Sequence, residues 1–180
     1  KGLQIISTNN QILCKKDRSD INPTIHKGSI GEISPQEMQI IEPIVHRLSQ
    51  ILRANNSFGP GSIDLISHTV NNQKKYTIIE CNKRITGGYH TYLAKRFNVN
   101  HFFSDVNMYC HPSTSFNQVI GALESNNLLW NKNNKYGTFI VNWQTVPHAS
   151  KIAVLCLGEN YYHASSIHKA TKEVLANLSI

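Results

Sequence analysis

The clearest hydrophobic pattern in the chain runs from residue 34 to residue 54 and predicts an amphipathic helix. Ser34 to Glu37 form a capping box, in which the Ser34 hydroxyl accepts from the Glu37 amide and the Glu37 side chain reaches back. Pro35 suits the first helical turn, where its missing N–H costs nothing, whereas Pro43 should kink the helix or displace a hydrogen bond. We expect the apolar stripe to be core. Its members recur every three or four positions: Met38, Ile41, Val45, Leu48 and Leu52, flanked by Ile40, Ile44 and Ile51.

Two β-rich runs, Ser62–Val70 and Lys75–Asn82, predict the strands of an antiparallel hairpin. A glycine-rich turn at 58–61 precedes them, and residues 71–74 are expected to connect them. Because successive strand residues point to opposite faces, each strand has one face that carries polar side chains.

Three oxygen-bearing side chains of this hairpin, Asp64, Glu80 and Asn82, form the strongest candidate site. Glu80 and Asn82 share a face of their strand and lie about 6.6–7 Å apart along it, and Asp64 can share that face from the neighbouring strand. Mg²⁺ prefers oxygen ligands, usually one or two carboxylates together with water and phosphate oxygens. The pattern therefore predicts a Mg²⁺ site, and the alternative is an ordinary solvent-facing hairpin edge.

The rest of the chain predicts an α+β fold. The expected elements are strands at 3–6 and 11–14, a loop at 15–33, a helix at 89–97, a strand at 106–110, a helix at 115–125, strands at 136–144 and 151–157, and a helix at 162–178. The sequence changes character at residues 98–105, so we expect two domains, 1–100 and 101–180. The second has the order of a small βαββα domain, with helices on one face of an antiparallel sheet.

Composition narrows the function classes. The chain has 18 Lys and Arg against 11 Asp and Glu, but the basic residues are dispersed and do not alternate with aromatic residues, so little favours nucleic acid as a partner. No apolar run is long enough to span a membrane. The four cysteines have no CxxC spacing, which favours reduced, packed thiols and a cytoplasmic location.

The order of residues in the hairpin resembles the signature of the ATP-grasp superfamily. Ile63-Asp64-Leu65 on one strand is followed by Ile78-Ile79-Glu80-Cys81-Asn82-Lys83-Arg84 on the next, a strand with an acid and then Glu-x-Asn. The continuation TGGYHTYLAKRF resembles peptide ligases of the pheganomycin-synthesis type, which carry a pre-ATP-grasp region. Residues 136–142 and 151–158 are similar to the closing domain of that group.

This resemblance implies an ATP-dependent carboxylate–amine ligase. ATP would phosphorylate a carboxylate, and an amine, from an amino acid or peptide, would attack the acyl phosphate to form an amide. The expected cofactors are ATP and Mg²⁺, with Mn²⁺ as an alternative. The implied metal ligands are Asp64, Glu80 and Asn82. Ile66 and Ile79 would lie near the adenine, and Arg84 would contact phosphate or the acyl phosphate.

Two neighbours of these residues are further candidates with a plain alternative. Lys83, beside Arg84, is a candidate for phosphate contact, and the alternative for both is a solvated surface. His90 lies close enough in sequence to Asn82 to meet substrate, and the alternative is a structural histidine.

The sequence departs from the family pattern in two places. Ser62 stands where some ATP-grasp ligases carry an Arg, and the N-terminal substrate region and first ATP-binding half have no counterpart here. We therefore expect residues 1–100 to be the later, C-terminal half of an ATP-grasp domain, with the missing half supplied in cis or by another chain. The alternative is a degenerate, non-catalytic ATP-grasp-like binding or scaffold module. Homo-oligomer formation stays open.

Overall fold

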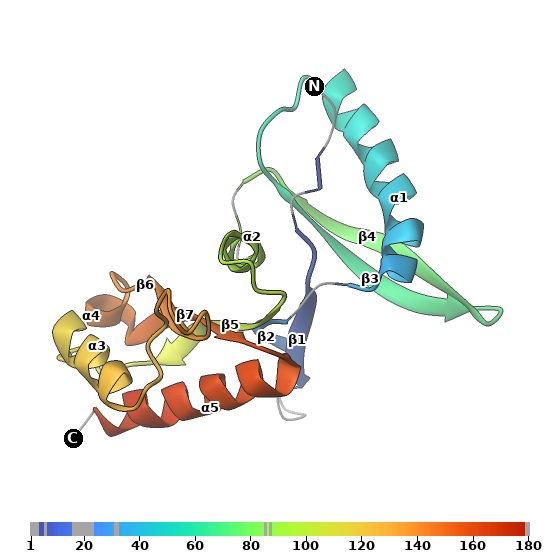
Figure 1. Ribbon diagram of the computed structural model, residues 1–180. Helices are drawn as coiled ribbons and strands as arrows, with labels where there is room; N and C mark the ends of the chain where they lie inside the picture. Colours follow the sequence, from blue (N-terminus) through green and yellow to red (C-terminus); the bar gives the residue numbers. More distant parts are fainter. Residues whose placement is uncertain are drawn as a thin grey trace. The chain divides into compact units, whose positions relative to one another are not determined.

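The computed structural model has a mixed α+β architecture with two antiparallel sheets (Figure 1). It describes residues 4–5, 7–15, 24–30, 33–84, 86 and 88–178. The described residues form seven strands and five helices. The chain divides into two compact units, which we call the hairpin unit (residues 1–8 and 33–89) and the sheet unit (residues 9–32 and 90–180).

The hairpin unit begins with the predicted helix, α1 (Pro35–Ala54). The capping box is confirmed: the Glu37 amide donates to Ser34 Oγ (3.2 Å), and the Ser34 amide donates to Glu37 Oε2 (3.1 Å). The buried stripe of α1 is narrower than predicted, because Ile41 and Val45 are buried whereas Ile40 and Ile51 are exposed.

The second part of this unit is the hairpin of β3 (Ser62–Val70) and β4 (Gln73–Asn82). Its connection is shorter than predicted, with only Asn71 and Asn72 between the paired residues Val70 and Gln73. Both asparagines have positive φ, 50° and 60°, which is what a two-residue type I′ turn requires at its two central positions. Asparagine tolerates that conformation better than most residues, so the Asn-Asn pair explains the tight turn.

Helix α1 packs against one face of the hairpin through a polar contact at its first turn. Glu37 Oε1 accepts hydrogen bonds from Lys74 Nζ and from the Tyr76 hydroxyl, the latter at 2.7 Å. The hydrogen bond from Lys74, followed by that from Tyr76, lowers the pKa of Glu37 to about 2. The capping residue of the helix thus also ties the helix to β4.

The sheet unit is built on five antiparallel strands in the order β1-β2-β5-β7-β6. The strands are β1 (Asn10–Lys15), β2 (Thr24–Ile30), β5 (His101–Tyr109), β6 (Gly137–Asn142) and β7 (Lys151–Gly158). The helices are α2 (Tyr89–Arg96), α3 (Phe116–Ser125), α4 (Val146–Ala149) and α5 (Tyr161–Asn177).

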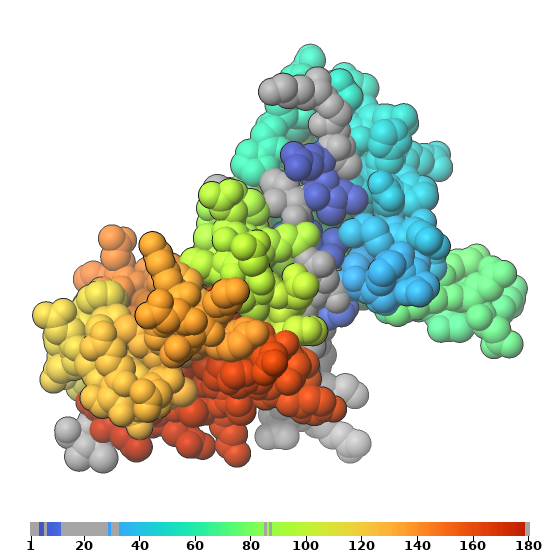
Figure 2. All heavy atoms as spheres, viewed as in Figure 1, coloured from blue at the N-terminus to red at the C-terminus, as the bar shows by residue number. Residues whose placement is uncertain are grey.

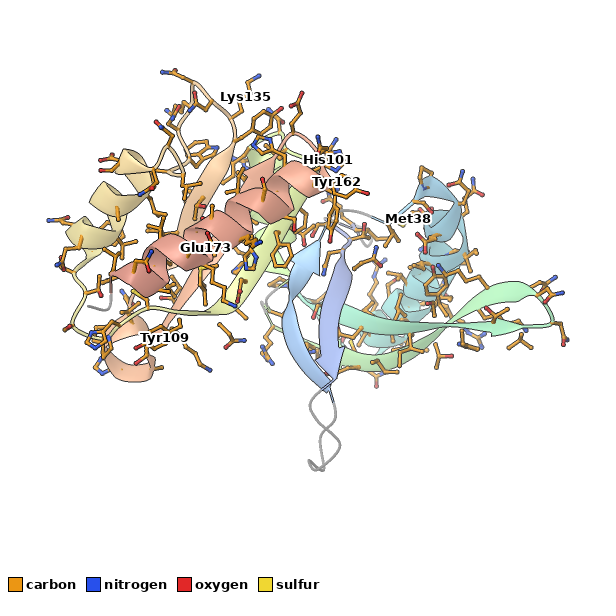
Figure 3. The ribbon with its side chains drawn as sticks, turned by 90° about the horizontal axis from the view of Figure 1, so that it is seen from below. Met38, His101, Tyr109, Lys135, Tyr162 and Glu173 are labelled. Carbon is orange, nitrogen blue, oxygen red and sulfur yellow. The ribbon has the colours of Figure 1, made fainter. Side chains whose placement is uncertain are left out.

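Strand β7 lies inside this sheet and is buried on both faces. Ile152, Val154 and Cys156 pack with α3 and α5 on one face. Leu155 and Leu157 pack on the other face with α2 and with Phe102 of β5. Figure 3 shows α5 lying over the strands, with the labelled Glu173 on its exposed side.

Several sequence predictions differ from these elements. Strand β2 lies in the predicted 15–33 loop, and β5 begins at His101 inside the predicted boundary. Gln4 and Ile5 form no strand, and the other residues of the predicted 3–6 strand lie outside the described part. The units also divide elsewhere than at residue 100, because β1, β2 and α2 pack within the sheet unit.

No helix in the described part of the chain is long and apolar enough to cross a membrane.

Candidate functional site

The register of the β3–β4 ladder brings the three predicted metal ligands to one face. Asp64 lies directly opposite Glu80, and Ser62 lies directly opposite Asn82. Residues opposite each other in an antiparallel pair share a face, with Cβ atoms about 4.5–5.5 Å apart. We call the face formed by Ser62, Asp64, Glu80 and Asn82 the acidic face.

A β-bulge creates this arrangement. From the turn, the ladder runs regularly from Val70–Gln73 to Leu65–Ile78, and the register then shifts by one residue before Asp64–Glu80. Ile79 is therefore an extra residue in β4. Continuing the regular register would place Asp64 opposite Ile79 and turn Glu80 to the other face, since a one-residue slip reverses every side chain. Bulges of this kind re-aim side chains and are common beside active sites.

The two faces of the hairpin have different surroundings. Tyr76 pairs with Ser67, on the face opposite Asp64, and it is this face that Glu37 of α1 contacts. Along the acidic face, Asp64 and Asn82 are half-buried and Glu80 is exposed. In Figure 2 the turn end of the hairpin, drawn in green, extends past the light-blue α1.

Two large apolar side chains lie next to the acidic residues and are exposed. Ile66 follows Asp64 by two residues on the same face and is 52% exposed. Ile79, the bulge residue, is 60% exposed. Exposed isoleucines offer the apolar contact that the predicted adenine contact requires, although single exposed apolar residues are also common on protein surfaces.

Lys83 and Arg84 follow β4 directly and are exposed. His90 belongs to the sheet unit, where it is 7% exposed. Its Nδ1 atom is hydrogen-bonded to the hydroxyl of Ser104 on β5, and Ser104 pairs with the buried Ser29 of β2. This setting favours the structural alternative for His90, because a buried histidine with a buried partner is held in place by it.

The donor set of the acidic face fits a hard cation. Two carboxylates and an amide supply only oxygen ligands, which Mg²⁺ and Mn²⁺ accept and which suit zinc less well. Within the described ranges, no three His, Cys, Asp or Glu side chains gather into a metal-binding group. A site on the acidic face would therefore need further oxygen ligands from a bound phosphate or water.

The sheet unit also contains a polar pair that the sequence pattern did not predict. His168 Nε2 of α5 lies 2.9 Å from Asp105 Oδ2 of β5, and the imidazole stacks on Phe103 at a centroid distance of 3.9 Å. His168 lies on the face of α5 that carries the buried Ile167, Thr171 and Leu175. Its helical spacing from these positions is the sequence signal that could have placed it against the sheet. The pair links α5 to β5 inside the sheet unit.

Comparisons with protein-family models, with curated proteins and with solved structures find no match to this chain.

Proposed function

We propose that this chain is the metal-holding and C-terminal part of an ATP-dependent carboxylate–amine ligase of ATP-grasp type. The observation that carries the proposal is the direct opposition of Asp64 and Glu80 with Asn82 on the same face. The motif resemblance supplies the chemistry: activation of a carboxylate as an acyl phosphate and its capture by an amine.

Asp64 and Glu80, which pair across the ladder, carry like charges. Like charges directly opposite each other destabilise an antiparallel pair, and the bulge at Ile79 brings Asp64 and Glu80 into that position. A cation between the two carboxylates would remove the repulsion. A bound Mg²⁺ would also neutralise charge on the phosphates of ATP during phosphoryl transfer.

The neighbouring residues have roles in the same proposal. Asp64, Glu80 and Asn82 would hold the cation, and Lys83 and Arg84 would contact phosphate oxygens, Arg84 through its planar fork of donors. Ile66 and Ile79 would contact the adenine. The small carboxylate and amine substrates and the cytoplasmic location belong to the proposal as well.

The first test is Mn²⁺ binding, followed by electron paramagnetic resonance of the free ion during titration of the chain. We expect saturable binding that Asp64→Asn and Glu80→Gln each weaken strongly, and Mg²⁺ should compete. Glu42→Gln, an exposed carboxylate change on α1, is the matched control and should bind as the unaltered chain does. Equal binding by all four chains would sink the assignment of the acidic face.

A second measurement separates the ligase from the binding or scaffold alternative. ADP release from Mg-ATP is followed with the first ATP-binding half present, in cis or as the partner chain, and with a mixture of amino acids as carboxylate and amine donors. Release that both substitutions abolish supports the ligase. Mn²⁺ binding without ADP release favours the scaffold module.

A further inference from the structure

Gly61, the residue before β3, lies directly against the end of β4. A Cβ atom at this position would lie 2.6 Å from the carbonyl oxygen of Asn82, and 3.6 Å from both the Asn82 carbonyl carbon and Lys83 Cα. Real Cβ contacts essentially never fall below 3.0 Å. The obstacle is backbone, which cannot rotate away as a side chain can. Any other residue at position 61 would displace the chain at Asn82 and Lys83.

The backbone conformation of Gly61 does not explain why glycine stands there. The glycines with positive φ in the described part are Gly59 and Gly137, so another residue could adopt the conformation at position 61. Gly61 is also exposed, and a side chain there would not enter the core. Space beside Asn82 is the remaining requirement.

Gly59, two residues earlier, shows the contrasting case. Its φ is 113°, which L residues rarely adopt, and a Cβ there would meet nothing within 4 Å. Glycine is needed at 59 for conformation and at 61 for close approach. A substitution at Gly59 therefore tests the conformation of the turn, whereas a substitution at Gly61 tests the close approach at the end of β4.

We propose that Gly61 is a positioning residue for the acidic face. This inference rests on the function proposed above. Its missing side chain lets the backbone of Asn82 and Lys83 run against the start of β3. That close approach fixes where Asn82 presents its amide oxygen and where Lys83 and Arg84 leave the strand. Since Ser62 pairs with Asn82, the contact lies one residue beyond the last pair of the ladder.

The test compares Gly61→Ala with Gly59→Ala in the full chain, by Mn²⁺ affinity and by thermal unfolding. Gly61→Ala should weaken Mn²⁺ binding by about 10–100-fold, the range for residues that orient metal ligands, with little change in Tm. It should also shift the amide resonances of Asn82 and Lys83. Gly59→Ala should lower Tm, because it forces alanine into a positive φ, and leave Mn²⁺ affinity unchanged.

Three outcomes overturn the proposal. If the unaltered chain binds Mn²⁺ and Gly61→Ala binds it equally well, Gly61 does not position the site, while the proposed function stands. If Gly61→Ala does not fold, Gly61 holds the fold rather than the acidic face. If the unaltered chain does not bind Mn²⁺, the proposed function fails and this inference fails with it.

Discussion

Strand β7 pairs with antiparallel neighbours, as β3 and β4 pair with each other, but the two regions differ in what covers them. β7 has α3 and α5 on one face and α2 on the other, and its residues from Ile152 to Gly158 are buried. In the hairpin, residues 66–70 of β3 are all exposed, and α1 contacts one face. Among the described residues of the hairpin unit, Ile41 and Val45 are the buried apolar side chains.

This difference indicates a division of tasks. A hairpin needs further strands or a helix to be stable in water, and α1 supplies that support on one side. Ligand-binding elements are commonly drawn from the less stable parts of a protein. The sheet unit has an extensive buried core, whereas the hairpin unit buries few apolar side chains and carries the acidic face that we propose to bind a cation. Four predictions test this comparison.

The largest expected effect is in β7. Leu155→Ala should lower the free energy of unfolding of the sheet unit by about 2–5 kcal/mol, since it leaves a cavity at a fully buried position. Ile66→Ala, at an exposed position of β3, should change stability by less than about 0.5 kcal/mol. Urea titration followed by circular dichroism measures both. Similar losses would contradict the comparison.

The next effect concerns a buried polar contact in the sheet unit. The Thr138 and Thr171 hydroxyls lie 2.6 Å apart and both residues are fully buried. Thr171→Val removes one partner and should cost about 1–3 kcal/mol. Adding Thr138→Val should recover part of the loss, because it removes the Thr138 hydroxyl, which the single variant leaves with only the Cys156 thiol at 3.6 Å as a weak partner. Tryptophan fluorescence reports on this unit, since Trp130 and Trp143, the two tryptophans, both lie in it. A double variant less stable than the single one would refute the account.

The hairpin unit should respond to acid through Glu37. Its pKa falls from 4.5 to about 2 in the folded chain, so its contribution to stability is full above pH 4.5 and is lost as pH falls toward 2. Because the ion pair with Lys74 is partly exposed, we expect about 1 kcal/mol or less. Glu37→Gln should remove this dependence, and Glu42→Gln should retain it. The measurement is urea unfolding of the hairpin unit by NMR across that pH range.

The smallest effect lies on the acidic face. Without metal, Glu80→Gln should stabilise the hairpin by about 0.2–1 kcal/mol, since it removes the like charge opposite Asp64. With Mg²⁺ the order should reverse, because the unaltered chain gains stability from binding. Thermal unfolding with chelator and with excess Mg²⁺ gives both values. A destabilised Glu80→Gln chain in chelator would argue against repulsion at this pair.

The sequence predicted α1 and the hairpin strands well, because a capping box and regular spacing act over a few residues. The shared face of Asp64 and Glu80 could not be derived in the same way. Alternation gives the faces of each strand but not their register. The predicted four-residue connection would have paired Asp64 with Cys81. The two-residue turn and the bulge at Ile79 together restore the pairing with Glu80.

Strand β2 was missed for a related reason. Its sequence, TIHKGSI, is mostly polar, and the strand forms between β1 and β5, which pair with it from both sides. The support from β5 comes from residues more than 70 positions away, which a local pattern does not contain. The setting of His90 depends on the same pairing, since its partner Ser104 lies opposite Ser29.

The placement of Cys81, Cys110 and Cys156, the cysteines whose side chains the structure describes, makes the hairpin observable by chemical labelling once Cys14 is replaced by serine. Cys110 and Cys156 are buried, and burial raises the pKa of both thiols, that of Cys156 to about 12, so neither reacts readily with alkylating dyes. Cys81 is exposed and lies between Glu80 and Asn82 in β4. It pairs with Ile63 and so points to the face opposite the carboxylates. A fluorophore attached to Cys81 would report on cation binding from the opposite face of β4, without occupying the acidic face.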